Sequence, residues 1–262
     1  MRGKKMSQAM AFIVLFAGEA SNGFKHGVAV IVLIVGIVIG AVAGVVSAKK
    51  VKMTDMPQLV SVFNTVGGGA AALVALNDIL TSAETPSIVV LITAGLGIMI
   101  GSVTFSGSLI AAGKLQGIKW VKKLSLPGKG FWNILFVVLT IVSFVMLCVQ
   151  PNQRLLWSIL TTVFALCYGL VFVIPIGGAD MPVVISVLNA CTGTAVAMSG
   201  LAINNIALIV AGALVGAAGV TLSIAMSKAM NRPLLSVLAG GFGGSNSAAG
   251  AGEGLEGTMK ET

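Results

Sequence analysis

Two asparagines lie where an apolar helix would have its centre, and each follows an aspartate by nine residues. Asn64 follows Asp55, and Asn189 follows Asp180. At about 1.5 Å per residue, each amide lies about 13 Å along a helix that starts at its aspartate. That is roughly halfway through a hydrocarbon core about 30 Å thick. An amide donates and accepts hydrogen bonds, so it can order water, but it cannot itself carry a proton at neutral pH.

Each of these residues has two interpretations. A buried amide is costly to leave unpaired, so the asparagines either line a water path or hydrogen-bond between helices and stabilise their packing. The aspartates either act at the membrane surface or only cap the helices that they precede. Asp180 favours the functional alternative more strongly than Asp55, because Asp55 lies beside the lysines at 49, 50 and 52.

No titratable side chain that could relay a proton lies near the middle of a predicted span. His26 is the only histidine and precedes an apolar run. We interpret it as a surface residue, with an outer proton mouth as the alternative. A proton path through this chain would therefore need an ionisable group from another chain, or water alone.

Several other kinds of site are excluded by residue type and spacing. Cys148, Cys167 and Cys191 lie inside apolar runs without metal-ligand spacing, so we interpret them as packing residues. The glycines between 212 and 219 lie inside an apolar run and not in a strand–turn–helix unit, which argues against a phosphate-binding loop. We expect no catalytic residue, metal site or cofactor site in this chain.

The composition places these residues in a membrane. The 262 residues are 56% hydrophobic and 9% charged, whereas a soluble domain carries about 25% charged residues. The apolar runs predict an all-α membrane protein, a polytopic helical bundle of about eight transmembrane helices. The expected spans are 9–18, which is short, 27–48, 56–80, 87–113, 131–149, 155–174, 181–203 and 206–230.

Three features of these spans carry structural expectations. Gly36, Gly40 and Gly44 recur every four residues, which favours close approach of a neighbouring helix. The glycines at 67–69 predict flexible backbone at membrane depth. The spans 131–149 and 155–174 are expected to lack buried polar groups and to face lipid or brace the bundle.

The segments that begin at the two aspartates form an internal repeat. Asp-Met-Pro, Ser, Asn and Gly match at a constant offset, at Asp55-Met56-Pro57, Ser61, Asn64 and Gly68 and at Asp180-Met181-Pro182, Ser186, Asn189 and Gly193. The Ser, Asn and Gly are spaced i, i+3, i+7, so they share one helix face. Four spans separate the two aspartates, so both lie on the same side of the membrane and the repeat is parallel.

The distribution of basic residues predicts the orientation. With the N-terminus inside, fourteen of the sixteen Lys and Arg residues fall in inner segments, and only Lys25 and Arg154 fall outside. This follows the positive-inside rule, so the net charge of +8 reflects topology and not nucleic-acid binding. We assign residues 1–239 to a transmembrane domain and 240–262, which are rich in Gly, Ser and Ala, to a flexible linker.

Several long motifs appear in the order found in one known family. They are 53–60 (MTDMPQLV), 101–108 (GSVTFSGS), 114–117 (KLQG), 177–184 (GGADMPVV), 229–232 (AMNR) and 236–243 (SVLAGGFG). The chain between Gly27 and Gly243 resembles the membrane domain of the beta subunit of proton-translocating NAD(P) transhydrogenase. It departs from that family in ending at the linker, in its short first span, and in lacking a histidine in 88–96.

The resemblance implies that this chain is the proton-conducting part of a bacterial inner-membrane enzyme, with both termini cytoplasmic. It implies hydride transfer from NADH to NADP⁺ on soluble domains outside this chain, which hold NAD(H) and NADP(H). The implied partners are an NADP(H)-binding domain and alpha subunits, in a homodimer of the assembly. We infer a split alpha with a small membrane subunit that supplies the ionisable group.

The resemblance and the repeat together assign roles to residues. Asn189 is expected on the proton path, with Ser186 and Asn64. Asp180 is expected to couple the path to the NADP(H)-binding domain. The other residues assigned to coupling are Asp55, Gly216, Gly219 and Arg232. Two alternatives stay open, namely a secondary transporter or channel subunit with parallel repeats and a purely structural fragment.

Overall fold

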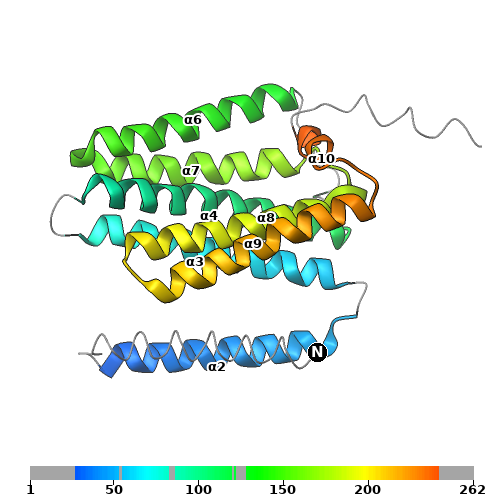
Figure 1. Cartoon of the computed structure of the whole chain (residues 1–262), viewed down its shortest axis with the longest axis horizontal. Coiled ribbons are helices and arrows are strands. Elements are labelled where there is room, and N and C mark those ends of the chain that lie inside the picture. The colour runs from blue at the N-terminus through cyan, green and yellow to red at the C-terminus, as the bar shows by residue number, and fades with distance from the viewer. Residues whose placement is uncertain (1–26, 53–54, 83–85, 120, 122–127, 242–262) are drawn as a thin grey trace, which may run out of the picture.

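The computed structural model describes residues 27–52, 55–82, 86–119, 121 and 128–241, and every regular element in these ranges is helical. Figure 1 shows the long helices lying roughly side by side. They are α2 (Gly27–Lys50), α3 (Met56–Thr81), α4 (Ile88–Leu115), α6 (Lys129–Val149), α7 (Arg154–Val173), α8 (Met181–Ala202) and α9 (Ile206–Ala229). The short elements are η2 (Pro151–Gln153), η3 (Gly178–Asp180) and α10 (Leu234–Gly241).

Six helices among the described residues, α3, α4 and α6 to α9, are long and apolar enough to cross a membrane. Their bounds differ from the expected spans by only one or two residues at each end. The all-α prediction is confirmed for the described ranges. The expected span 27–48 coincides with α2, whereas the short span 9–18 and His26 lie outside the described residues.

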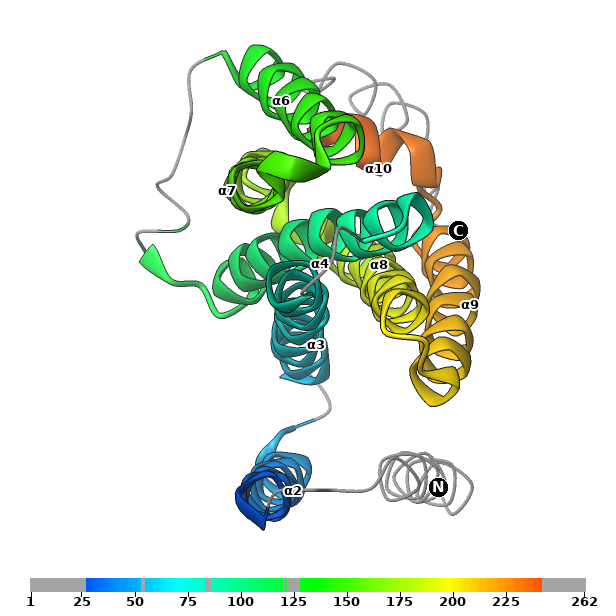
Figure 2. The same cartoon turned by 90° about the vertical axis from the view of Figure 1, so that its left-hand side faces the viewer.

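Helix α4 lies at the centre of the bundle, as the end-on view in Figure 2 shows. Helices α3, α7 and α8 pack against α4, α6 packs on α7, and α9 packs on α8. Figure 1 also shows that α3 and α8 run in the same direction. The internal repeat itself stays a prediction from the sequence.

Small residues set the distances between these helices. A methyl group on Gly101 of α4 would lie 2.6 Å from the Gly68 carbonyl oxygen of α3, far inside van der Waals contact. One on Gly219 of α9 would lie 2.6 Å from the Ala190 Cα of α8. Backbones approach this closely only where at least one of the two helices carries no side chain at the crossing.

The glycines at 67–69 lie inside the continuous helix α3, so the prediction of flexible backbone there is wrong. Gly68 is buried against α4, and a methyl group on Gly69 would strike the ring of Phe105. These glycines admit a neighbouring helix and do not loosen their own. Helix packing restores the order that glycine propensity alone would reduce.

Helix α2 lies apart from the bundle in Figures 1 and 2. No heavy atom of the described chain lies within 4 Å of a methyl group built on Gly36, Gly40 or Gly44. The glycine stripe favours close approach of a neighbouring helix, but no helix of the described chain packs against it.

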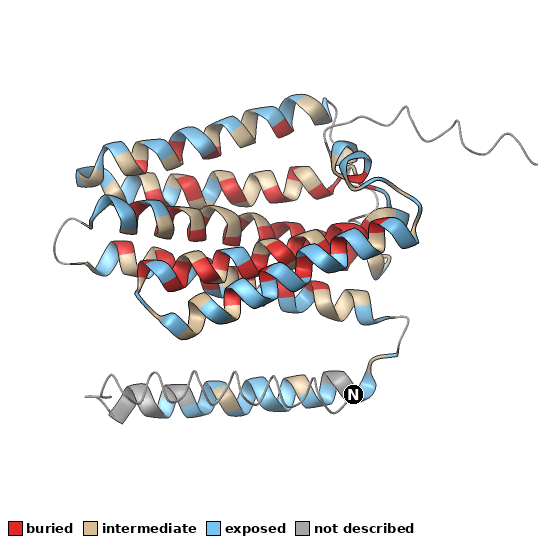
Figure 3. Ribbon diagram, in the orientation of Figure 1, coloured by how far each residue is buried: buried red, intermediate tan, exposed pale blue. Residues whose placement is uncertain are grey.

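Burial is concentrated on α4 and α8, as the red segments of Figure 3 show. The expectation that 131–149 and 155–174 lack buried polar groups is wrong. Helices α6 and α7 bury five of them: Asn133, Thr140, Ser143, Ser158 and Thr161. The four hydroxyls donate to carbonyls of their own helices or to a hydroxyl of the neighbouring helix, so they satisfy most of their hydrogen bonding locally.

Candidate functional site

The turn between α7 and α8 presents Asp180 at one end of the bundle. The helix starts where the sequence predicts, with Asp180 at the N-cap position and Pro182 in the first turn. The side chain of Asp180 makes no capping hydrogen bond, and neither does that of Asp55 at the start of α3. The capping alternative is therefore wrong for both carboxylates in this structure, which leaves them available for other partners.

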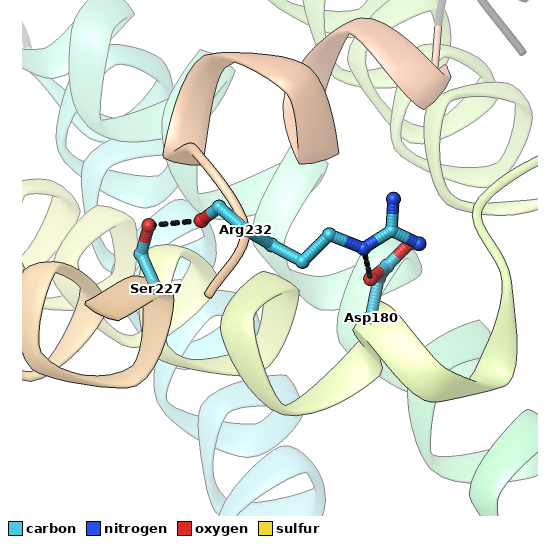
Figure 4. Close-up of polar contacts among 3 residues, drawn as sticks. All are labelled: Asp180, Ser227 and Arg232. Carbon is cyan, nitrogen blue, oxygen red and sulfur yellow. Dashed lines mark hydrogen bonds and ion pairs between the residues drawn. The ribbon is translucent and has the colours of Figure 1, made fainter. Parts of the chain in front are cut away.

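Asp180 pairs with Arg232, which follows the end of α9. The Arg232 Nε lies 3.4 Å from Asp180 Oδ1, and Nη2 donates to Oδ2 at 3.4 Å (Figure 4). Oδ1 is buried but accepts no hydrogen bond with good geometry from the described residues, so the attraction is mainly coulombic. Asp180 and Arg232 are 16% and 38% exposed, so water screens the pair only in part.

The backbone after α9 fixes the position of Arg232. Asn231 adopts a left-handed conformation with φ of 49° and ends the helix. The Arg232 backbone N–H donates to the Ser227 carbonyl at 3.1 Å, and the Ser227 hydroxyl donates to the Arg232 carbonyl (Figure 4). Ser227 thus holds both backbone groups of Arg232. This fixes the direction of the Arg232 side chain, which points toward the α7–α8 turn.

The glycines that precede Asp180 do not need their extra conformational freedom. Gly177 has φ of −65°, and Gly178 is not among the residues with positive φ. Both are exposed, and a methyl group on either would touch nothing within 4 Å. They leave the outer face of the turn open.

Asn189 lies on the strip of α8 between the contacts with α3 and those with α9. Its neighbours one turn away at 185 and 192 face α3, since Ile185 accepts a hydrogen bond from Asn64 and Thr192 lies against Gly67. Its neighbour at 193 faces Gly216 of α9. Asn189 is partly exposed and finds no hydrogen-bond partner among the described residues.

Asn64 and Ser186 have different surroundings. The Asn64 side chain is 3% exposed, and its Nδ2 donates to the Ile185 carbonyl of α8 at 3.3 Å. The Ser186 hydroxyl, which is buried, donates to the Val183 carbonyl of its own helix at 2.7 Å. Both donors are used within the bundle, and the place of these residues on a proton path stays a prediction.

Gly216 and Gly219 both face α8, but with different clearance. A methyl group on Gly219 would lie 2.5 Å from the Ala190 backbone nitrogen, next to Asn189 in the chain. A methyl group on Gly216 would lie 3.5 Å from the nearest atom, which is ordinary contact. Gly219 is therefore the residue that sets the α8–α9 spacing beside Asn189.

Asp55 is exposed and lines a cavity of about 470 Å³ at the start of α3. Gln58 and Gln116 also line it, and the Gln58 Oε1 is buried without a hydrogen bond from the described residues. The structure thus joins Asp180 to Arg232 and Asn64 to α8. It does not bring Asp55 to any of the other predicted site residues.

Sequence reasoning missed one cation at this end of the bundle. The Lys114 ammonium donates to the carbonyls of Val173 and Ile176 at 3.2 and 2.8 Å, and also to that of Ile174. Its only signal in the sequence is a lysine at the end of an apolar span within the KLQG motif. The acceptors are backbone atoms some sixty residues further on, so no residue type marks them.

The described residues hold no group of three or more His, Cys, Asp or Glu side chains placed to bind a metal ion. The three cysteines are free and partly buried within the spans. The polar groups that the described residues offer for function are amides, carboxylates and the Asp180–Arg232 ion pair.

These features define a multi-pass membrane protein of central helices packed through small residues, with a partly exposed amide near the middle of α8 and an ion pair at one end of the bundle. Comparison with known proteins then gives the family. The chain belongs to the NAD(P) transhydrogenase beta subunit family, whose model matches residues 2–262.

Two curated relatives, both from Rhodospirillum rubrum and one from a designated strain, are named NAD(P) transhydrogenase subunit beta. Each is 42% identical over 227 residues, which is 84% of this chain and 48% of the relative. The chain therefore spans about half the length of the curated relatives that it matches.

Proposed function

We propose that this chain forms the proton-conducting membrane part of a proton-translocating NAD(P) transhydrogenase. The observation that carries the proposal is the position of Asn189, at mid-depth on α8, partly exposed and unpaired among the described residues. Family membership supplies the reaction with which proton movement is coupled, namely hydride transfer between NADH and NADP⁺. The alternative of a secondary transporter has no specific observation in its favour.

The amide of Asn189 orders water between α3 and α9, and water carries the proton. An amide cannot take up the charge itself, so an ionisable group reaches this strip from another chain. We assign that group to an alpha membrane subunit, in a split alpha arrangement. We place Ser186 and Asn64 beside this path, where their buried side chains, bonded to carbonyls of α8, hold the helices around it without meeting the water themselves.

Coupling runs through the carboxylate end of α8. Asp180, at the N-cap of α8, lies about two and a half turns before Asn189. Arg232 lies on the segment that leads through α10 toward the linker. A movement of the NADP(H)-binding domain at that linker reaches Arg232 first, then Asp180 and α8. Gly219 and Gly216 keep α9 in register with α8, and Asp55 offers a second carboxylate at the same end.

Nucleotide binding belongs to domains outside this chain. A dinucleotide fold needs parallel strands with glycine-rich turns, whereas the described residues form only helices. We therefore assign NADP(H) to a domain beyond the linker and NAD(H) to a partner subunit. The assembly is a homodimer in the bacterial inner membrane, with both termini cytoplasmic, and the charge asymmetry supports this orientation.

The test is proton movement by the assembled complex in liposomes. Asn189→Leu should abolish proton movement and leave assembly intact, because leucine is close in size but orders no water. Thr194→Val is the matched control, since Thr194 is an exposed residue of α8 whose hydroxyl donates to its own helix at the Ala190 carbonyl. Normal pumping by Asn189→Leu would show that Asn189 is not on the path.

A further inference from the structure

The turn that carries Asp180 is exposed on its outer side. Gly177, Gly178 and Ala179 are exposed. On its inner side the turn meets α4, whose last helical turn contributes Lys114. Lys114 contacts the residues that connect the end of α7 to this turn, from Val173 to Ile176.

Lys114 acts on those residues through three carbonyl groups. Its ammonium has three N–H donors, and it donates to the carbonyls of Val173, Ile174 and Ile176. A helix leaves its last carbonyls without intrahelical partners and carries partial negative charge at that end. A partly buried lysine with its cation at the helix end suits this position. Hydrogen bonds from a charged donor are stronger than those from a neutral one.

The contact continues directly to the ion pair. Ile176 is followed by Gly177, whose carbonyl accepts the backbone N–H of Asp180 at 3.2 Å. The Asp180 carboxylate then meets Arg232. Lys114 is thus linked to Arg232 through four residues of turn and a single backbone hydrogen bond. Side chains alone would not fix this turn in the same way, since their apolar contacts are non-directional.

We propose that Lys114 is a positioning residue for coupling: it holds the α7–α8 turn on α4 and so sets where Asp180 meets Arg232. Its effect on turnover rests on the proposed function. Without the Lys114 ammonium, the turn moves when Arg232 moves, and α8 stays in place. With the ammonium, the turn is held on α4, so a displacement of Arg232 moves α8 and Asn189.

The first test measures turnover of the assembled complex in liposomes. Lys114→Met keeps most of the stem and removes the donors and the charge. It should lower the kcat of proton-coupled hydride transfer about tenfold. The KM for NADH should change by less than about twofold, because that site lies on a partner. Lys114→Arg should restore at least about half of the rate, since it keeps a cation at the helix end. Lys119→Met is the matched control, because Lys119 is exposed just beyond α4.

The second test reads the turn directly. A nitroxide on Ala179→Cys, with Cys148, Cys167 and Cys191 replaced by alanine, should become more mobile in Lys114→Met and return to the parent mobility in Lys114→Arg. This measurement needs no turnover, so it tests the positioning role of Lys114 even if the wild-type complex moves no protons. Absence of proton movement in the wild type would refute the proposed function and leave the positioning role untouched.

An unchanged nitroxide spectrum in Lys114→Met, or wild-type kcat in that variant, would overturn the proposal. If Lys114→Met fails to assemble, Lys114→Gln takes its place, since its amide donates without charge. Lys114→Gln should show a mobility between those of the parent and a freely moving turn, with a reduced kcat. Parent values of both quantities in Lys114→Gln would also overturn the proposal.

Discussion

The helix pairs α3–α4 and α8–α9 are built alike but placed differently. Each begins with Asp-Met-Pro without a side-chain cap, and each crosses its partner through glycine. Each partner helix ends in a residue of positive φ, Gly117 or Asn231, followed by a residue whose N–H bonds back to the last turn. The identity of that residue differs: it is Ile118 after the first pair and Arg232 after the second.

This difference decides what each carboxylate can do. Arg232 reaches Asp180, whereas an isoleucine offers no charge to Asp55, which stays exposed beside a cavity. The amides differ in the same sense. Asn64 is buried and bonded to α8, and Asn189 is partly exposed and unpaired among the described residues. We infer that the α3–α4 pair contributes mainly to the packing of the bundle. The α8–α9 pair carries the residues proposed for proton movement and coupling.

The largest contrast that we predict concerns the glycine crossings. A methyl group on Gly193 would lie 2.6 Å from the Gly216 Cα, a backbone atom that cannot move alone. One on Gly68 would lie 2.9 Å from the Gly101 carbonyl oxygen. Overpacking costs about 1–3 kcal/mol, and Gly193→Ala should fall at the upper end and Gly68→Ala at the lower. Thermal unfolding in detergent checks the order, with Gly36→Ala as a neutral control. Equal losses would contradict the geometry.

The next contrast concerns the carboxylates. Asp180→Asn removes the charge that meets Arg232 and should lower coupled turnover about tenfold. Asp55→Asn should change coupled turnover by less than about twofold, because Asp55 is exposed and water screens the interactions of an exposed charge. Initial rates of proton-coupled hydride transfer in the assembled complex measure both. A larger loss of turnover in Asp55→Asn than in Asp180→Asn would mean that the α3–α4 pair, and not the α8–α9 pair, carries the coupling carboxylate.

The smallest contrast concerns stability at the two amides. Asn64→Ala loses a buried hydrogen bond between helices, which costs about 0.6–1 kcal/mol in membrane proteins. Asn189→Ala loses no hydrogen bond to the described residues, so its unfolding temperature should stay near that of the parent. Thermal unfolding of the two variants in the same detergent makes the comparison. A greater loss for Asn189→Ala would mean that this amide is a packing residue.

The spans could be predicted because apolar length is a local signal. Six helices begin and end within one or two residues of the expected bounds, and the starts at Met56 and Met181 coincide with the Asp-Met-Pro motifs. The short helix α10 was not expected, since eight residues give too short a periodic pattern to mark a helix. The hydroxyls of α6 and α7 were misread, because a hydroxyl that bonds to its own helix gives no sign in the sequence of being buried.

The site could be predicted only where residue type was enough. Asn189 is an unusual residue inside an apolar span, and Asp180 stands in a motif that marks a helix start; the structure leaves Asn189 partly exposed and pairs Asp180 with Arg232. The pairing of Asp180 with Arg232 spans 52 residues and depends on the turn at Asn231. The contacts of Lys114 are made to backbone atoms. Neither follows from spacing along the chain, because both are set by how α4, α7 and α9 end together at one side of the bundle.

The central claim is that Asn189 meets water and Asn64 does not. Each asparagine can be replaced by cysteine in a chain whose native cysteines are alanine, and a charged thiol reagent can be applied to the assembled complex in membranes. We predict that Asn189→Cys reacts at least about tenfold faster than Asn64→Cys, because the reacting thiolate forms only in contact with water. Equal protection of the two cysteines would contradict the account.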